Sequence, residues 1–82
     1  MFNLFVSIHK MKRLRRIASH ETILENGIRQ TLSVIEIQEG KVVSCYPLTE
    51  ELPQTEWMAG QIVLRRDDDG ILRAYHNNRI IN

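Results

Sequence analysis

The sequence predicts an all-β fold, a small antiparallel sandwich or open barrel of about 5–7 strands built from two hairpins. Val, Ile and Thr together supply 19 of the 82 residues whereas Ala supplies three, and β-branched side chains favour strands. Apolar runs of strand length alternate with turn signals rich in Gly, Asn and Asp. A chain of 82 residues and 9.6 kDa is expected to form one domain with a thin core.

The N-terminal segment has two interpretations. Leu4, Ile8, Met11 and Leu14 fall at helical spacing with basic residues between them, which is typical of a basic amphipathic helix. Alternatively, Met11 and the basic residues after it resemble a natural chain start, so Met1 and Met11 both stay open as the native start. On this second interpretation we expect residues 1–10 to be a disordered extension and residues 11–82 to be a single β domain.

The central part of the chain predicts a strand followed by a hairpin. A first strand or strand pair covers residues 14–24 and ends at the turn signal Asn26-Gly27. Residues 31–37 and 41–48 then flank Glu39-Gly40, where glycine can take the positive φ that a short hairpin loop requires.

If Gln38 pairs with Lys41, both faces of this hairpin are apolar. One face then holds Ile35, Ile37, Val42 and Tyr46, and the other holds Leu32, Val34, Val43 and Cys45. Such a hairpin needs cover on both sides, from a second sheet, a helix or another subunit. A bulged loop would shift the register by one residue, and both registers remain open.

The C-terminal half predicts a second hairpin. Pro47 and Pro53 bracket an acidic connection, which we expect to cross from one sheet to another or to hold a single helical turn. The next strand has its apolar side at Met58, Ile62 and Leu64. Strands are expected at residues 57–66, 71–76 and 79–81, with turns at 67–70 and 77–78.

Charge is unevenly distributed along the chain. Residues 1–20 carry five basic residues and no acid, residues 21–60 carry seven Glu against two basic residues, and residues 61–82 carry four Arg against three Asp. The net charge of +1 and the pI of about 8.0 disfavour a nucleic-acid module, which usually has a domain-wide basic face. On an edge strand the basic cluster is solvated or paired with acids, whereas on a helix it gathers into a contact for an anionic partner. The cluster comprises Lys12, Arg13, Arg15 and Arg16.

No residue pattern indicates catalysis, a metal or a cofactor, and we expect a protein that is not an enzyme. Cys45 in an apolar run is typical of a buried small hydrophobe rather than a nucleophile. The three His lack metal-ligand spacing, and the three consecutive Asp before Gly70 lack the ligand pattern of a calcium loop. The apolar run 2–8 is too short for a membrane span and lacks the features of a secretory signal, so a cytoplasmic protein is expected.

Residues 16–60 resemble the N-terminal segment of amidohydrolase-superfamily proteins, which are metal-dependent hydrolases. The resemblance is carried by Arg16-Ile17-Ala18, Glu25-Asn26-Gly27, the hairpin over residues 34–43, and residues 55–60. In that family these pieces build a small composite β-sandwich beside the catalytic barrel. The family continues into the barrel with a His-x-His metal pair, which this chain lacks after Gly60. The resemblance therefore implies a β-sandwich-like module without the enzyme.

These observations favour a non-catalytic structural or protein-interaction module that associates with itself as a homodimer or with another protein. The residues expected in its interface or core are Ile35, Ile37, Val42, Tyr46 and Trp57. The alternative is a small nucleic-acid-binding β domain that uses the basic cluster, with Trp57, Tyr46 and Tyr75 as stacking platforms.

Overall fold

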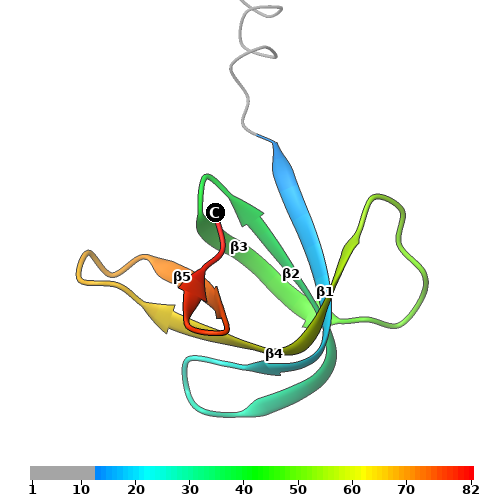
Figure 1. Ribbon diagram of the computed structural model, residues 1–82, viewed down its shortest axis with the longest axis horizontal. Coiled ribbons are helices and arrows are strands. Elements are labelled where there is room, and N and C mark those ends of the chain that lie inside the picture. The colour runs from blue at the N-terminus through cyan, green and yellow to red at the C-terminus, as the bar shows by residue number, and fades with distance from the viewer. Residues whose placement is uncertain (1–12) are drawn as a thin grey trace, which may run out of the picture.

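The computed structural model describes residues 13–82 as one curled, mixed β-sheet that forms a half-barrel (Figure 1). The sheet has six strands in the order β3-β2-β1-β4-β5-β6. The strands are β1 (Leu14–Ile23), β2 (Arg29–Gln38), β3 (Lys41–Pro47), β4 (Glu56–Arg66), β5 (Leu72–His76) and β6 (Arg79–Ile80). The prediction of an all-β fold is confirmed, and the helical interpretation is wrong from Leu14 onward. The expected extension over residues 1–10 lies outside the described residues, as does Lys12.

Local turn chemistry explains three of the four hairpins. Between β1 and β2, the Asn26 side chain accepts a hydrogen bond from the backbone N–H of Ile28 at 3.0 Å. Gly40 closes the β2–β3 turn with a φ of 75°. Asp67 opens the β4–β5 turn and accepts from the N–H groups of Asp69 and Ile71, both at 2.9 Å. Both hairpins expected from the sequence are therefore present.

The connection between β3 and β4 carries the chain across the sheet. It leaves the edge strand β3 and returns on the far side of β1, where β4 pairs with β1 in parallel (the yellow-green loop at the right of Figure 1). The expectation of a crossing between two sheets is wrong, because both strands belong to one sheet. The same crossing makes the sheet mixed rather than purely antiparallel.

This connection also covers part of the outer face of the half-barrel. Val34 and Ala18 are opposite one another in the β1–β2 register and are 0% and 2% exposed. Their chain neighbours Ile35 and Ile17 point into the core, so Val34 and Ala18 point outward. The connection is held there because Leu48 N–H donates to the Leu32 carbonyl oxygen at 2.7 Å.

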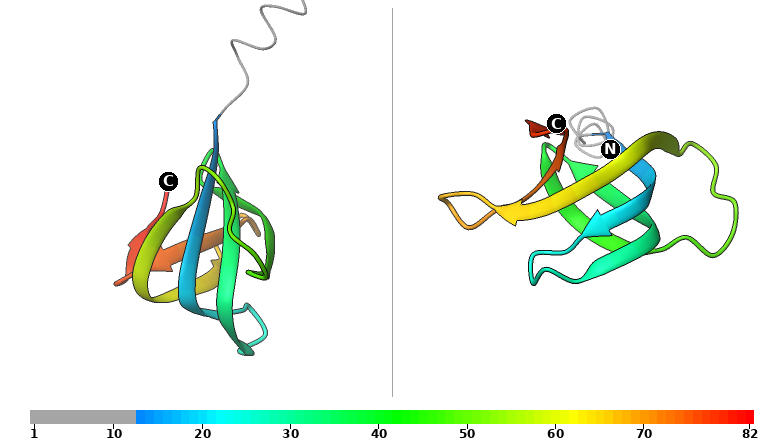
Figure 2. Two further views of the ribbon diagram at one scale, coloured as in Figure 1. Left: turned by 90° about the vertical axis from the view of Figure 1, so that its right-hand side faces the viewer. Right: turned by 60° about the horizontal axis from the view of Figure 1, so that its bottom comes forward.

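The core lies on the concave side of the sheet. Figure 2 shows the curl that forms this side. Its buried side chains are Ile17, Ile35, Ile37, Ile62, Leu64, Ala74 and Ile81. Partly buried apolar side chains, including Val42, Cys45 and Met58, pack against them. Each Ile or Leu that loses its contact with water here contributes about 1.5–3 kcal/mol.

A bulge decides which side chains of β3 face the core. Gln38 pairs with Lys41 and Ile37 with Val42, as the sequence predicts, but the register then shifts between Glu36 and Ile37. Val43 is the extra residue and is 52% exposed. Beyond it Ile35 pairs with Cys45 and Val34 with Tyr46, so Cys45 turns to the core and Tyr46 to the outer face. The predicted faces for Cys45 and Tyr46 are therefore wrong.

Candidate interaction site

The most open backbone of the sheet lies along the first half of β4. On one edge β4 pairs with β1 from Glu56 to Met58 and again from Gln61 to Val63. On the other edge it pairs with β5 only from Ile62 onward. Within residues 13–82, the stretch from Glu56 to Gln61 therefore has no strand on its second edge. Figure 2 shows this part of β4 as the yellow-green ribbon that curves past the C-terminal segment.

A groove of about 600 Å³ runs between this edge and β6. Met58, Ile80 and Ile81 supply its apolar lining, and His76, Arg79 and the two Asn of the β5–β6 turn and C-terminal segment supply most of the polar lining. Ile80 is 43% exposed. A groove of mixed polarity beside an unpaired edge is suited to an extended peptide segment.

Arg15 forms the floor of the groove near the start of β4. Its Nε and Nη2 atoms donate to the Glu56 carboxylate at 3.0 and 2.7 Å, and its Nη1 donates to the backbone oxygen of Asn82 at 2.6 Å. The bond with Arg15 lowers the pKa of Glu56, and the same bond raises the pKa of Arg15. Both side chains therefore stay charged and hold the C-terminal segment against β1.

His76 connects the end of β5 to the open part of β4. Its Nε2 atom lies 2.7 Å from the carbonyl oxygen of Ala59, which accepts the hydrogen bond. The bond lies where β4 has a bulge, since Gly60 has a φ of 91° and the β1–β4 register shifts there. The bulge limits the regular part of the open edge to the residues before Gly60.

Trp57 lies beside this edge and is 50% exposed. It is opposite Ala18 in the β1–β4 register, and its ring meets His20 edge-on, with centroids 4.7 Å apart and planes at 88°. Trp57 was expected in the interface or the core, and the core alternative is ruled out because β4 places the side chain half-exposed on the outer face. Sequence reasoning missed His20, since only the parallel pairing of β1 with β4 brings the two rings together.

The basic cluster is divided between the two faces of β1. Arg15 faces inward with Ile17 and bonds Glu56, whereas Arg16 faces outward and bonds Glu36 at 3.0 Å. Arg13 is exposed. The strand is central and not at an edge, which corrects that part of the expectation, but the pairing of its arginines with acids is observed.

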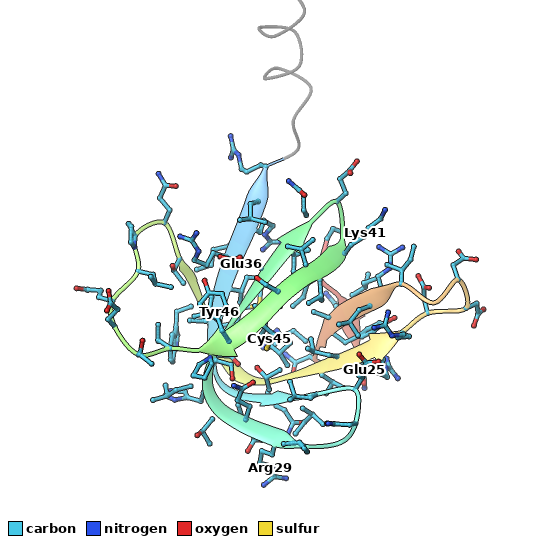
Figure 3. The ribbon with its side chains drawn as sticks, turned by 180° about the vertical axis from the view of Figure 1, so that it is seen from behind. Glu25, Arg29, Glu36, Lys41, Cys45 and Tyr46 are labelled. Carbon is cyan, nitrogen blue, oxygen red and sulfur yellow. The ribbon has the colours of Figure 1, made fainter. Side chains whose placement is uncertain are left out.

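Glu36 is the centre of a polar cluster on the outer face (Figure 3). Its carboxylate accepts from Ser44 Oγ at 2.6 Å, Tyr46 OH at 2.8 Å and Arg16 Nε at 3.0 Å. The hydrogen bonds from Ser44 and Tyr46 lower the pKa of Glu36. A carboxylate with a lowered pKa is a weak base towards the Ser44 hydroxyl, so the cluster ties β1, β2 and β3 together rather than activating a nucleophile.

Cys45 lies at the opposite mouth of the half-barrel, in a recess that it lines with Leu24, Leu64 and Leu72. Its thiol contacts Gln30 Oε1 at 3.7 Å, and burial raises its pKa. A raised pKa keeps the thiol protonated at neutral pH, which is opposite to what a cysteine nucleophile needs. This placement agrees with the expected role of Cys45 as a small apolar side chain.

In the part of the chain that the structure describes, no three His, Cys, Asp or Glu side chains come together as a metal site. Residues 13–82 likewise include no helix of the length and apolarity that crossing a membrane requires. Comparison of the chain with protein-family models, curated proteins and solved structures gives no match. The resemblance to amidohydrolase-superfamily proteins stays a prediction from the sequence.

Proposed function

We propose that this protein is a non-catalytic protein-interaction module that associates with itself. The observation that carries the proposal is the half-exposed Trp57 beside a strand edge that has no neighbouring strand within residues 13–82. A large aromatic ring held in place by His20 is a typical anchor of a protein interface. The open edge adds backbone donors and acceptors that a second chain can satisfy.

The reason for self-association differs from the one that the sequence suggested. Ile35 and Ile37 lie in the chain's own core, and Val42 packs against them. The outer face of the same hairpin holds Val34, which is buried, and Tyr46, which is bonded to Glu36. Most of both hairpin faces is thus covered within one chain, although Leu32 and Val43 stay 45% and 52% exposed. The proposal therefore depends on β4 instead.

Nucleic-acid binding receives less support from the same geometry. The guanidinium groups of Arg15 and Arg16 are already engaged with carboxylates. The expected stacking platforms lie on three strands, where Tyr46 bonds Glu36 and Tyr75 has Arg65 over its ring at 4.1 Å. An aromatic ring already covered by a cation offers little surface for a base.

Light scattering coupled to size-exclusion chromatography tests the proposal over a range of protein concentrations. We expect a species of about 19 kDa, twice the 9.6 kDa of one chain, whose fraction rises with concentration. A monomer at every concentration would overturn self-association. Salt-sensitive binding of an oligonucleotide by a monomer, weakened by Arg13→Ala, would instead favour the alternative.

A further inference from the structure

We infer that two copies of this chain associate through their β4 strands, which pair in antiparallel fashion along the open edge with Trp57 at the two-fold axis. This inference rests on the proposed self-association and names the surface that carries it. Such a pairing extends the sheet of one copy into the sheet of the other and satisfies backbone groups on both edges.

The length of the open edge suits a symmetric pairing about Trp57. The regular part of β4 runs from Glu56 to Ala59 and ends at the bulge that contains Gly60. With Thr55, the last residue of the β3–β4 connection, it forms a five-residue stretch centred on Trp57. In an antiparallel pair centred there, Trp57 lies opposite Trp57 of the partner subunit, and Glu56 lies opposite the partner's Met58. Five residues on each strand are within the common length of a β-strand.

The apolar side chains next to the edge favour burial on both faces of such a pair. Trp57 is half-exposed on the outer face. Met58 and Ile80 line the groove on the other face of β4. Pairing of two edges would therefore cover apolar groups above and below the new strand contact, which a foreign polar peptide would cover less well.

The charges along the open edge of β4 are compatible with a second copy of this chain as the partner. From Trp57 to Gln61 the strand has no charged residue and no proline. Glu56 is neutralised by Arg15 at 2.7 Å, so two copies can meet without unpaired like charges. A charged partner would find no charged group on this stretch of β4 to recognise.

Strand β3, at one end of the sheet, has an edge that differs in this respect. Strand β3 begins with Lys41, ends with Pro47 and holds a bulge at Val43. Charges, prolines and bulges are the features that protect edge strands from pairing with another chain. The open part of β4 has one charged residue, Glu56, which is paired with Arg15, and a bulge only at its end, so the two edges form an internal contrast that an experiment can use.

The experiment compares one charge placed on each edge. Ala59 and Val43 are both exposed, so Ala59→Glu and Val43→Glu are matched variants of the two edges. Ala59→Glu places an unpaired carboxylate opposite the partner's Thr55, on the face that carries the two Trp57 rings. We expect it to weaken dimer formation about tenfold or more, while Val43→Glu leaves it unchanged. Trp57→Ser serves as a second variant, which removes the aromatic contact and leaves the backbone intact. Far-UV circular dichroism checks that each variant is folded.

The single tryptophan provides an independent signal, because Trp57 is the only one in the chain. We expect the emission maximum of the wild-type protein to move to shorter wavelength over the concentrations at which light scattering shows the mass doubling. A dimer that persists unchanged in folded Ala59→Glu and Trp57→Ser, or whose emission does not move, would overturn this inference and leave self-association standing. A wild-type monomer at all concentrations would overturn both.

Discussion

Arg73 on β5 donates from Nη1 to the carbonyl oxygen of Gly40 in the β2–β3 turn at 2.9 Å. The two residues belong to elements that are not neighbours in the sheet, so this bond joins its two sides across the open seam. Arg73 is itself held by Asp67, whose carboxylate accepts from Nε at 2.9 Å. Among the described residues, the half-barrel is therefore closed here by a side chain and not by strand pairing.

The variant Gly40→Ala tests the contribution of this closure to stability, and Gly70→Ala is its control. Both glycines have positive φ, 75° and 80°, so each substitution carries the backbone strain of about 1–2 kcal/mol. A Cβ on Gly40 would lie 2.9 Å from Arg73 Nη1, whereas one on Gly70 meets open space. The end of the Arg73 side chain must then shift, which weakens its bond to Gly40. We therefore expect Gly40→Ala to lower the free energy of unfolding by about 0.5–1.5 kcal/mol more than Gly70→Ala does. Equal losses in urea denaturation would show that the closure adds no stability.

The Glu36 cluster predicts a loss of stability in acid. Hydrogen bonds from Ser44, then Tyr46 and Arg16, lower the pKa of Glu36 in the folded protein. The stabilisation is therefore present above the unfolded pKa and is lost as the pH falls through the lower folded pKa, below roughly pH 4–5. We expect Glu36→Gln to show a shallower fall of the melting temperature with acid than the wild-type protein. Glu51→Gln, on the exposed β3–β4 connection, is the control and should follow the wild-type curve.

The bulge in β3 predicts opposite outcomes for two apolar residues of the same hairpin. Ile35 is fully buried, so we expect Ile35→Ala to lower the free energy of unfolding by about 2–5 kcal/mol. Val43 is the exposed extra residue of the bulge, so Val43→Ala should change it by less than about 0.5 kcal/mol. Denaturant melts of the two variants provide the measurement. A large loss for Val43→Ala would contradict the observed register.

Cys45 predicts a slow reaction with thiol reagents in the folded protein. The side chain is half-buried and burial raises the pKa of its thiol, so little thiolate is present near pH 8. We expect an aromatic disulfide reagent to react with the native protein at least about tenfold more slowly than with the protein unfolded in urea. The absorbance of the released thiol follows both rates. Equal rates would place Cys45 on the surface and contradict its packing against Leu64 and Leu72.

The site was less predictable from the sequence than the fold. Trp57 was recognisable as a recognition anchor or core residue, but its exposure depends on the β1–β4 pairing. The acids that neutralise Arg15 and Arg16 lie 41 and 20 positions away, too far along the chain for any spacing rule to connect them. The open edge exists because β1 and β5 pair with β4 over different lengths. No single segment of the sequence shows this difference.

The sequence by itself determined the all-β class, the strands and the turns at Gly40 and Asp67, because β-branched composition and turn chemistry act over a few residues. Tertiary structure alone decided the parallel pairing of β1 with β4, the bulge at Val43 and the closure by Arg73. The closure depends on where the fold places one arginine side chain, and the parallel pairing and the bulge depend on backbone hydrogen bonds between strands. Such bonds are the same for every residue type, so they leave little trace in the order of the amino acids.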